Sequence, residues 1–212
     1  MTIESSTITN NDCGAGSTLT ACGGGARFGS LLNGALTVSM TNTVVAGNHD
    51  TNGGPSAPDL QMDTDDGFLF TSGGFNFVGD DTGATAHLTA GNPNGDGDFV
   101  GDSSVPLDPY LGGLSDHGGP TLTHSFVVPP AMATHPLADK GSCPGALADQ
   151  RGFAGAPGGP RIFDLAMQTN NPDGDACDIG ALEAGATAST PSAIFADGFE
   201  SGRFLFWSVD VP

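Results

Sequence analysis

The feature that most constrains the fold of this chain is a strand-and-turn segment, residues 35–48, which has an echo near the N-terminus. Across residues 36–41 apolar side chains alternate with small polar ones, and a Gly-Asn turn closes the run. Alternation of this kind, rich in β-branched residues, is typical of a half-buried strand. Residues 3–11 match residues 40–48 at a constant offset of 37 positions (3 to 40). A repeated strand-and-turn unit is typical of a solenoid.

Composition also favours strands and turns. The 212 residues include 34 Gly and 15 Pro, and only 14% are charged. Good helix formers such as Lys and Glu are scarce, which disfavours a helical protein. No run of about twenty apolar residues is present, so the sequence predicts no transmembrane helix. The expected fold class is all-β.

The charge balance restricts the partners. Five Lys and Arg stand against 24 Asp and Glu, which gives a formal charge of −19. So few cations cannot neutralise phosphates, and this argues against nucleic acid and anionic membranes as partners. Cation binding remains compatible with the charge.

The first residues do not resemble a secretion signal. They lack a basic segment and an apolar core, and they lie within a strand pattern. We therefore expect the chain to begin inside a longer solenoid.

The four cysteines fall into two pairs by position, Cys13 with Cys22 and Cys143 with Cys177. These positions are compatible with disulfides and an oxidising compartment. No Cys-x-x-Cys motif is present, so structural bridges are favoured over metal ligation.

Asn76 lies in a short predicted strand between Phe75 and Phe77. Stacked strands offer a buried amide partners above and below. The alternative is that Asn76 is simply a turn residue at the end of the strand.

A calcium site is one interpretation of the acidic run at residues 92–102. Asn92, Asn94, Asp96 and Asp98 alternate with Pro and Gly. Hard divalent cations need several oxygen ligands, which alternate positions of a tight loop can supply. The run lacks the EF-hand pattern, and the alternative is a solvated acidic loop.

Six motifs along the chain resemble a known family. They are Asn42-Thr-Val-Val-Ala-Gly-Asn48, Phe75-Asn-Phe-Val-Gly-Asp80, Asp108-Pro-Tyr-Leu-Gly112, Asp116-His-Gly-Gly-Pro-Thr-Leu-Thr-His124, Asp149-Gln-Arg-Gly152 and Cys177-Asp-Ile-Gly-Ala-Leu-Glu183. In this order they resemble bacterial choice-of-anchor Q domain proteins, which are similar to polymorphic outer-membrane and pectate-lyase-like β-helices. The resemblance implies a short right-handed parallel β-helix with an irregular, disulfide-linked C-terminal cap.

This resemblance gives the expected domain organisation. Residues 1–140 would form the coils of the β-helix, residues 141–185 the cap, and residues 186–212 a linker and an aromatic-rich tail. In the cap, Arg151 is expected to bridge Asp149, Asp178 or backbone carbonyls.

The functional expectation is an extracellular or surface-displayed bacterial protein with a structural, adhesive or glycan-contacting role, whose partner is a polysaccharide or another surface molecule. No residue is assigned to catalysis. The alternative is a polysaccharide lyase or glycoside hydrolase of the pectate-lyase-like type. Such an enzyme needs a base beside acidic residues or a pair of carboxylates in a groove.

Overall fold

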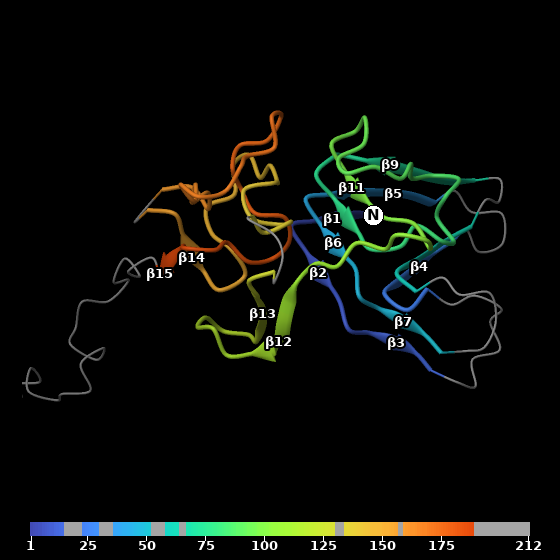
Figure 1. Cartoon of the computed structure of the whole chain (residues 1–212), viewed down its shortest axis with the longest axis horizontal. Helices are drawn as coiled ribbons and strands as arrows, with labels where there is room; N and C mark the ends of the chain where they lie inside the picture. Colours follow the sequence, from blue (N-terminus) through green and yellow to red (C-terminus); the bar gives the residue numbers. More distant parts are fainter. Residues whose placement is uncertain are drawn as a thin grey trace, which may run out of the picture.

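The computed structural model describes residues 1–14, 23–29, 36–51, 58–63, 67–129, 134–156 and 159–188 (Figure 1). Within these ranges the chain forms short strands and no helix. The strands are β1 (Thr2–Glu4), β2 (Thr7–Ile8), β3 (Asp12–Cys13), β4 (Ala26–Phe28), β5 (Leu36–Thr41), β6 (Val44–Val45), β7 (His49–Asp50), β8 (Leu60–Met62), β9 (Phe68–Ser72), β10 (Phe77–Val78), β11 (Phe99–Val100), β12 (Leu111–Ser115), β13 (Thr123–Phe126), β14 (Phe153–Ala154) and β15 (Thr187–Ala188). Accordingly, the described part of the chain has no helix long and apolar enough to cross a membrane.

Most strands pair in parallel. The sheet orders are β1-β5-β9, β2-β6-β10-β11, β3-β7 and β4-β8, and two antiparallel pairs, β12-β13 and β14-β15, complete the set. Ile3 is paired with Met40, and Thr7 with Val44. The first row of strands (β1, β2 and β3) pairs with the second row (β5, β6 and β7). The offset of 37 positions seen in the sequence is therefore the register of this pairing.

The prediction of a single right-handed parallel β-helix was wrong. Paired residues are 37 positions apart at Ile3 and Met40, 33 apart at Val44 and Phe77, and 22 apart at Phe77 and Phe99. The strands are two to six residues long and form several small separate sheets. In the described part of the chain the spacing between paired residues is not constant, and the strands do not continue as one regular solenoid.

Parallel pairing ends at β11. After it, β12 and β13 pair antiparallel as a hairpin, whose connection includes Gly118 and Gly119, both at positive φ. Glycine adopts this backbone conformation at little cost, which allows the chain to reverse. The hairpin interrupts the stacking that a regular solenoid would continue.

Three strands of the four-stranded sheet, β6, β10 and β11, are buried on both faces. Neighbouring residues of a strand point to opposite sides. Val45 and Val78 belong to an inner core cluster, whereas Val44 and Phe77 belong to an outer cluster that includes Ile179. The predicted cap therefore packs against the side of the strand stack rather than closing its end, and Figure 1 shows this orange-coloured region beside the sheets.

Asn76 is a stacked amide, as one of the two interpretations predicted. It is 0% exposed. Its Oδ1 accepts a hydrogen bond from the Thr43 N–H at 3.2 Å, and its Nδ2 donates to the Met40 carbonyl at 3.0 Å. On the other side, Nδ2 donates to Asp98 Oδ1 at 2.9 Å. The amide thus joins neighbouring rows of strands.

We expect Asn76→Leu to lower the free energy of unfolding by about 2–4 kcal/mol, because buried backbone and carboxylate partners lose their hydrogen bonds. Chemical denaturation followed by circular dichroism measures this change. Asn170→Leu, at an exposed asparagine, is the matched control and should change stability by less than about 0.5 kcal/mol. Equal effects of the two variants would contradict the prediction.

Candidate functional site

In the predicted calcium loop, the side chains of Asn94 and Asp98 form hydrogen bonds with other groups of the protein. Asn94 Oδ1 accepts hydrogen bonds from the N–H groups of Asp96 and Asp98 at 2.9 and 3.0 Å. Asp98 is fully buried, and its Oδ2 accepts a bond from Ser72 at 2.6 Å. Burial raises the pKa of Asp98. Calcium binding by Asn92, Asn94, Asp96 and Asp98 stays a prediction, and it would require Asp98 to leave its partners in the core.

Arg151 lies at the centre of a set of cap contacts. Its Nη2 is 2.6 Å from Asp149 Oδ2 and donates to the Glu183 carbonyl at 2.7 Å. Its guanidinium carbon lies 4.4 Å from the centre of the Phe153 ring, an arrangement that favours a cation–π interaction. Asp178, the other predicted partner, makes its bonds elsewhere.

Arg161 is the most deeply buried cation of the described chain, and sequence reasoning gave it no role. It is 1% exposed. Its Nε is 3.1 Å from Glu183 Oε2, and its Nη2 donates to three backbone carbonyls, those of Asp178, Gly180 and Leu182. One sequence feature could have indicated this buried role. Arg161 follows a Gly/Pro-rich segment in a chain that has only five Lys and Arg.

Two carboxyl groups, Asp178 and Glu183, complete this cluster, and both are 0% exposed. Asp178 accepts hydrogen bonds from the N–H groups of Asp139 and Ala184. Burial, followed by the charge of Glu183, raises the pKa of Asp178 well above its ordinary value. Burial also raises the pKa of Glu183, although Arg161 opposes this. Such enclosed groups hold the fold together and are not positioned to meet a substrate.

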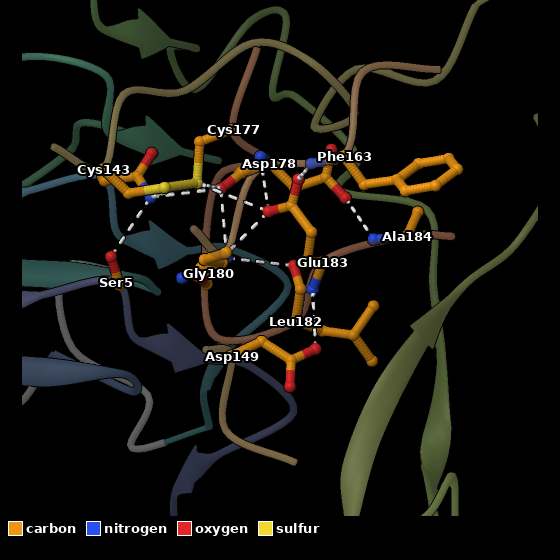
Figure 2. Close-up of polar contacts among 12 residues, drawn as sticks. Ser5, Cys143, Asp149, Phe163, Cys177, Asp178, Gly180, Leu182, Glu183 and Ala184 are labelled. Carbon is orange, nitrogen blue, oxygen red and sulfur yellow. Dashed lines mark hydrogen bonds and ion pairs between the residues drawn. A yellow bond between two sulfur atoms is a disulfide. The ribbon is translucent and has the colours of Figure 1, made fainter. Parts of the chain in front are cut away.

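The predicted disulfide between Cys143 and Cys177 is confirmed, and it adjoins the buried carboxyl groups (Figure 2). Cys177 Sγ is 3.4 Å from Glu183 Oε2. Among the described His, Cys, Asp and Glu residues, only these three lie close enough together to hold a metal ion. Sulfurs joined in a disulfide do not offer thiolate ligands, so the cluster does not fit a metal. The pairing of Cys13 with Cys22 stays a prediction, since Cys22 lies outside the described residues.

An open groove of about 420 Å³ lies beside the first row of strands. Thr7 and Thr9 are among the residues that line it. Thr7 is paired with Val44, and the same offset aligns Thr9 with Ala46. Val44 and Ala46 belong to the outer apolar cluster. The first row therefore has hydroxyl groups where the next row has apolar side chains, and its outer face is left as a polar groove.

The walls of the groove come from the hairpin and the C-terminal region. Leu122 and His124 come from the hairpin, and Gln150 lies beside them, since its Nε2 donates to Thr121 Oγ1 at 3.0 Å. His124 Nδ1 is 2.7 Å from the Gly112 carbonyl, so the neutral ring carries its proton there and Nε2 can accept a hydrogen bond. None of the described lining residues is Asp, Glu, Lys or Arg. The groove thus offers hydroxyl, amide and aliphatic groups to a ligand.

Comparisons of the chain with family models, curated proteins and solved structures found no match. The choice-of-anchor Q resemblance rests on the sequence motifs alone. A shared fold would in any case leave the activity open, because function depends on the site.

His135 contacts both the β12–β13 hairpin and the chain that follows it. Its ring stacks on Phe126 with centroids 4.4 Å apart. Nδ1 accepts from the Leu137 N–H, so the neutral ring carries its proton on Nε2, which lies 3.1 Å from the Tyr110 carbonyl. Burial lowers the pKa of His135, against opposing contributions from the Tyr110 bond and the Asp108 charge.

The lowered pKa of His135 predicts a pH effect on stability. The unfolded chain binds the proton more readily, so the contribution of His135 is complete above about pH 6.5 and falls as the pH drops towards the folded pKa. The difference in melting temperature between wild type and His135→Phe should therefore shrink between about pH 7.5 and about pH 5.5. His49→Gln, at an exposed histidine, is the control. A difference that is constant over this range would contradict the prediction.

Proposed function

We propose that this protein is a non-catalytic, exported surface protein that binds a polysaccharide in the groove beside β2. The observation that carries the proposal is an open cavity lined by short hydroxyl and amide side chains and free of charged groups among its described residues. Hydroxyl and amide groups both donate and accept hydrogen bonds, which matches the hydroxyl groups of a sugar.

Aliphatic side chains complete the match. Leu114 and Leu122 line the groove and are 56% and 51% exposed. They offer apolar surface to the C–H faces of a sugar ring, and burial of that surface favours binding. The net charge of −19 repels anionic polysaccharides, so the proposed ligand is neutral or cationic.

Export is supported by the disulfide. The Cys143–Cys177 bond closes a separation of 34 residues. Disulfides form and persist mainly in oxidising compartments outside the cytosol. A surface or extracellular location is therefore part of the proposal.

The proposal is tested by calorimetric titration of the full chain with a panel of neutral and cationic oligosaccharides. We expect Leu122→Ala to weaken binding about fivefold, since part of an apolar contact is lost. Leu147→Ala is the matched control, because Leu147 is 74% exposed and lies outside the described groove lining. Absence of binding by every glycan, or equal effects of the two variants, would overturn the proposal.

The enzymatic alternative is tested in the same samples. A lyase or hydrolase needs a base and carboxylates that reach the substrate. Arg151 lies beside Asp149, and Arg161 beside Glu183, but none of these four side chains is among the described lining residues of the groove. If chromatography detects products after prolonged incubation with any glycan, the protein is an enzyme and the proposal of a non-catalytic role is wrong.

A further inference from the structure

The hairpin places a polar and an apolar side chain of the groove next to each other. Leu114 of β12 is paired directly with His124 of β13, and both residues line the groove. Side chains paired across two antiparallel strands lie on the same face, with Cβ atoms about 5 Å apart. Leu122, two positions before His124, also lines the groove. The hairpin therefore presents one imidazole together with two exposed leucines.

The imidazole of His124 is held by the neighbouring strand. Its Nδ1 lies 2.7 Å from the Gly112 carbonyl and donates to it. The other ring nitrogen, Nε2, is then the acceptor of the neutral ring. Among the described residues, Nε2 has no hydrogen-bond partner. The hairpin thus offers a ligand a hydrogen-bond acceptor that lies beside an apolar surface.

An acetamido group on a sugar ring matches this pair of neighbours. A secondary amide is planar and trans. Its methyl group therefore lies on the same side of the C–N bond as its N–H, and its carbonyl oxygen lies on the other side. The N–H can donate to His124 Nε2 while the methyl group contacts Leu114, the cross-strand neighbour of His124. A hydroxyl group at the same position of the sugar has no methyl group to make the second contact.

The carbonyl oxygen of an acetamido group also needs a partner, and the groove contains donors near β2. Thr7 Oγ1 accepts a hydrogen bond from the Ala181 N–H at 3.0 Å, so the hydroxyl retains its own proton to donate. Asn10 is exposed, and its side-chain amide has two N–H donors. Both Thr7 and Asn10 line the groove. Each of the three parts of an acetamido group therefore has a matching group in the lining.

The lining favours an acetylated amino sugar over one with a free amine. A free amine is largely protonated at about pH 7, whereas an acetylated nitrogen is uncharged. None of the described lining residues is Asp or Glu. A cation that left water for the groove would find no carboxylate there, and an unpaired charge is costly to desolvate.

We propose that the groove binds a polysaccharide that contains N-acetylated amino sugars, with the acetamido N–H on His124 Nε2 and the methyl group against Leu114. This inference rests on the proposed function, since it concerns the same groove. It narrows the neutral or cationic ligand of that proposal to one chemical class. It also assigns to His124 the distinction between an acetamido group and a hydroxyl group.

The test compares three tetrasaccharides that have the same β-1,4 linkage and are built from N-acetylglucosamine, glucose or glucosamine. They differ only in the acetamido, hydroxyl or amino group at carbon 2. Calorimetric titration of the full chain measures their affinities. We expect the N-acetylglucosamine tetrasaccharide to bind at least about tenfold more tightly than either of the others, because it gains a hydrogen bond and a methyl contact.

Replacement of the imidazole tests the assigned contact. His124→Phe removes the acceptor and keeps an aromatic ring. It should weaken binding of the N-acetylglucosamine tetrasaccharide about fivefold and change the affinity for the glucose tetrasaccharide by less than about twofold. His49→Gln is the matched control, because His49 is exposed and lies outside the described groove lining. This control should leave all affinities unchanged.

A second measurement uses the wild-type protein and does not depend on the folding of a variant. NMR spectroscopy of the imidazole nitrogens reports on the hydrogen bond of His124 directly. The Nε2 resonance should shift when the N-acetylglucosamine tetrasaccharide saturates the protein, and it should not shift with the glucose tetrasaccharide.

The outcomes separate the two proposals. Equal affinities for the N-acetylglucosamine and glucose tetrasaccharides, or tighter binding of the glucosamine tetrasaccharide, would overturn the acetamido inference while the glycan-binding function stands. An Nε2 resonance that does not respond to the N-acetylglucosamine tetrasaccharide would do the same. Absence of binding by these tetrasaccharides and by every other glycan of the panel would overturn both.

Discussion

Replacement of Arg161 by methionine should lower the free energy of unfolding by about 3–5 kcal/mol. The substitution leaves the Glu183 carboxylate buried without its cation, and it removes the donor from three backbone carbonyls. Removal of one member of a buried ion pair is costly because the remaining charge stays out of water. Methionine retains much of the apolar volume, so the loss reports on the polar contacts.

Urea denaturation of wild type and Arg161→Met measures this change. Arg27→Met is the matched control, because Arg27 pairs with Asp63 at 3.3 Å and its side chain is 37% exposed. Its cost should be no more than about 1 kcal/mol. A double variant, Arg161→Met with Glu183→Gln, should recover part of the loss, since it no longer leaves a buried charge unpaired. Equal costs at Arg161 and Arg27 would show that the buried cluster contributes little to stability.

Removal of the disulfide should have the second large effect. Cys143 and Cys177 are 34 residues apart. Opening a loop of this length restores conformational entropy to the unfolded chain and costs about 3–4 kcal/mol in the loop-closure model. We therefore expect Cys143→Ala/Cys177→Ala to unfold at a clearly lower urea concentration than wild type.

Reduction of the wild-type protein provides the control for this variant. Wild type and the double variant should have about the same stability in a thiol reductant, because the reductant opens Cys143–Cys177 in the wild type and the bond of Cys13 in both proteins. A double variant within about 1 kcal/mol of the oxidised wild type would contradict the prediction and indicate that the unfolded chain is already compact.

Local patterns in the sequence predicted local structure well. Alternation across residues 36–41 predicted the longest described strand, β5, because a side-chain period of two is fixed by strand geometry. The echo between residues 3–11 and 40–48 predicted their pairing, because like segments that stack in register keep like side chains in contact.

The packing of the C-terminal region was not predicted. The sequence feature that indicates this packing is the occurrence of two consecutive apolar residues in a strand, as in Val44-Val45 and Phe77-Val78. A strand with apolar residues on both faces is covered on both sides, and that pattern requires a second layer. The sequence at the groove differs from this pattern. Thr7-Ile8 pairs with Val44-Val45, and its outward residue, Thr7, is polar. The buried role of Arg161 depends on carbonyls brought together by distant packing, which no local pattern records.

The sideways packing of the C-terminal region has a consequence for biosynthesis. Val44, Phe77 and Phe99 are covered by Leu137 and Ile179, which leave the ribosome much later. Until then the growing chain presents a contiguous apolar stripe, and surfaces of this kind promote aggregation. Completion of the fold must wait for contacts between residues as far apart as Asn42 and Asp178, and contacts of such long range slow folding. A chain that ended before Leu137 would keep this stripe exposed permanently.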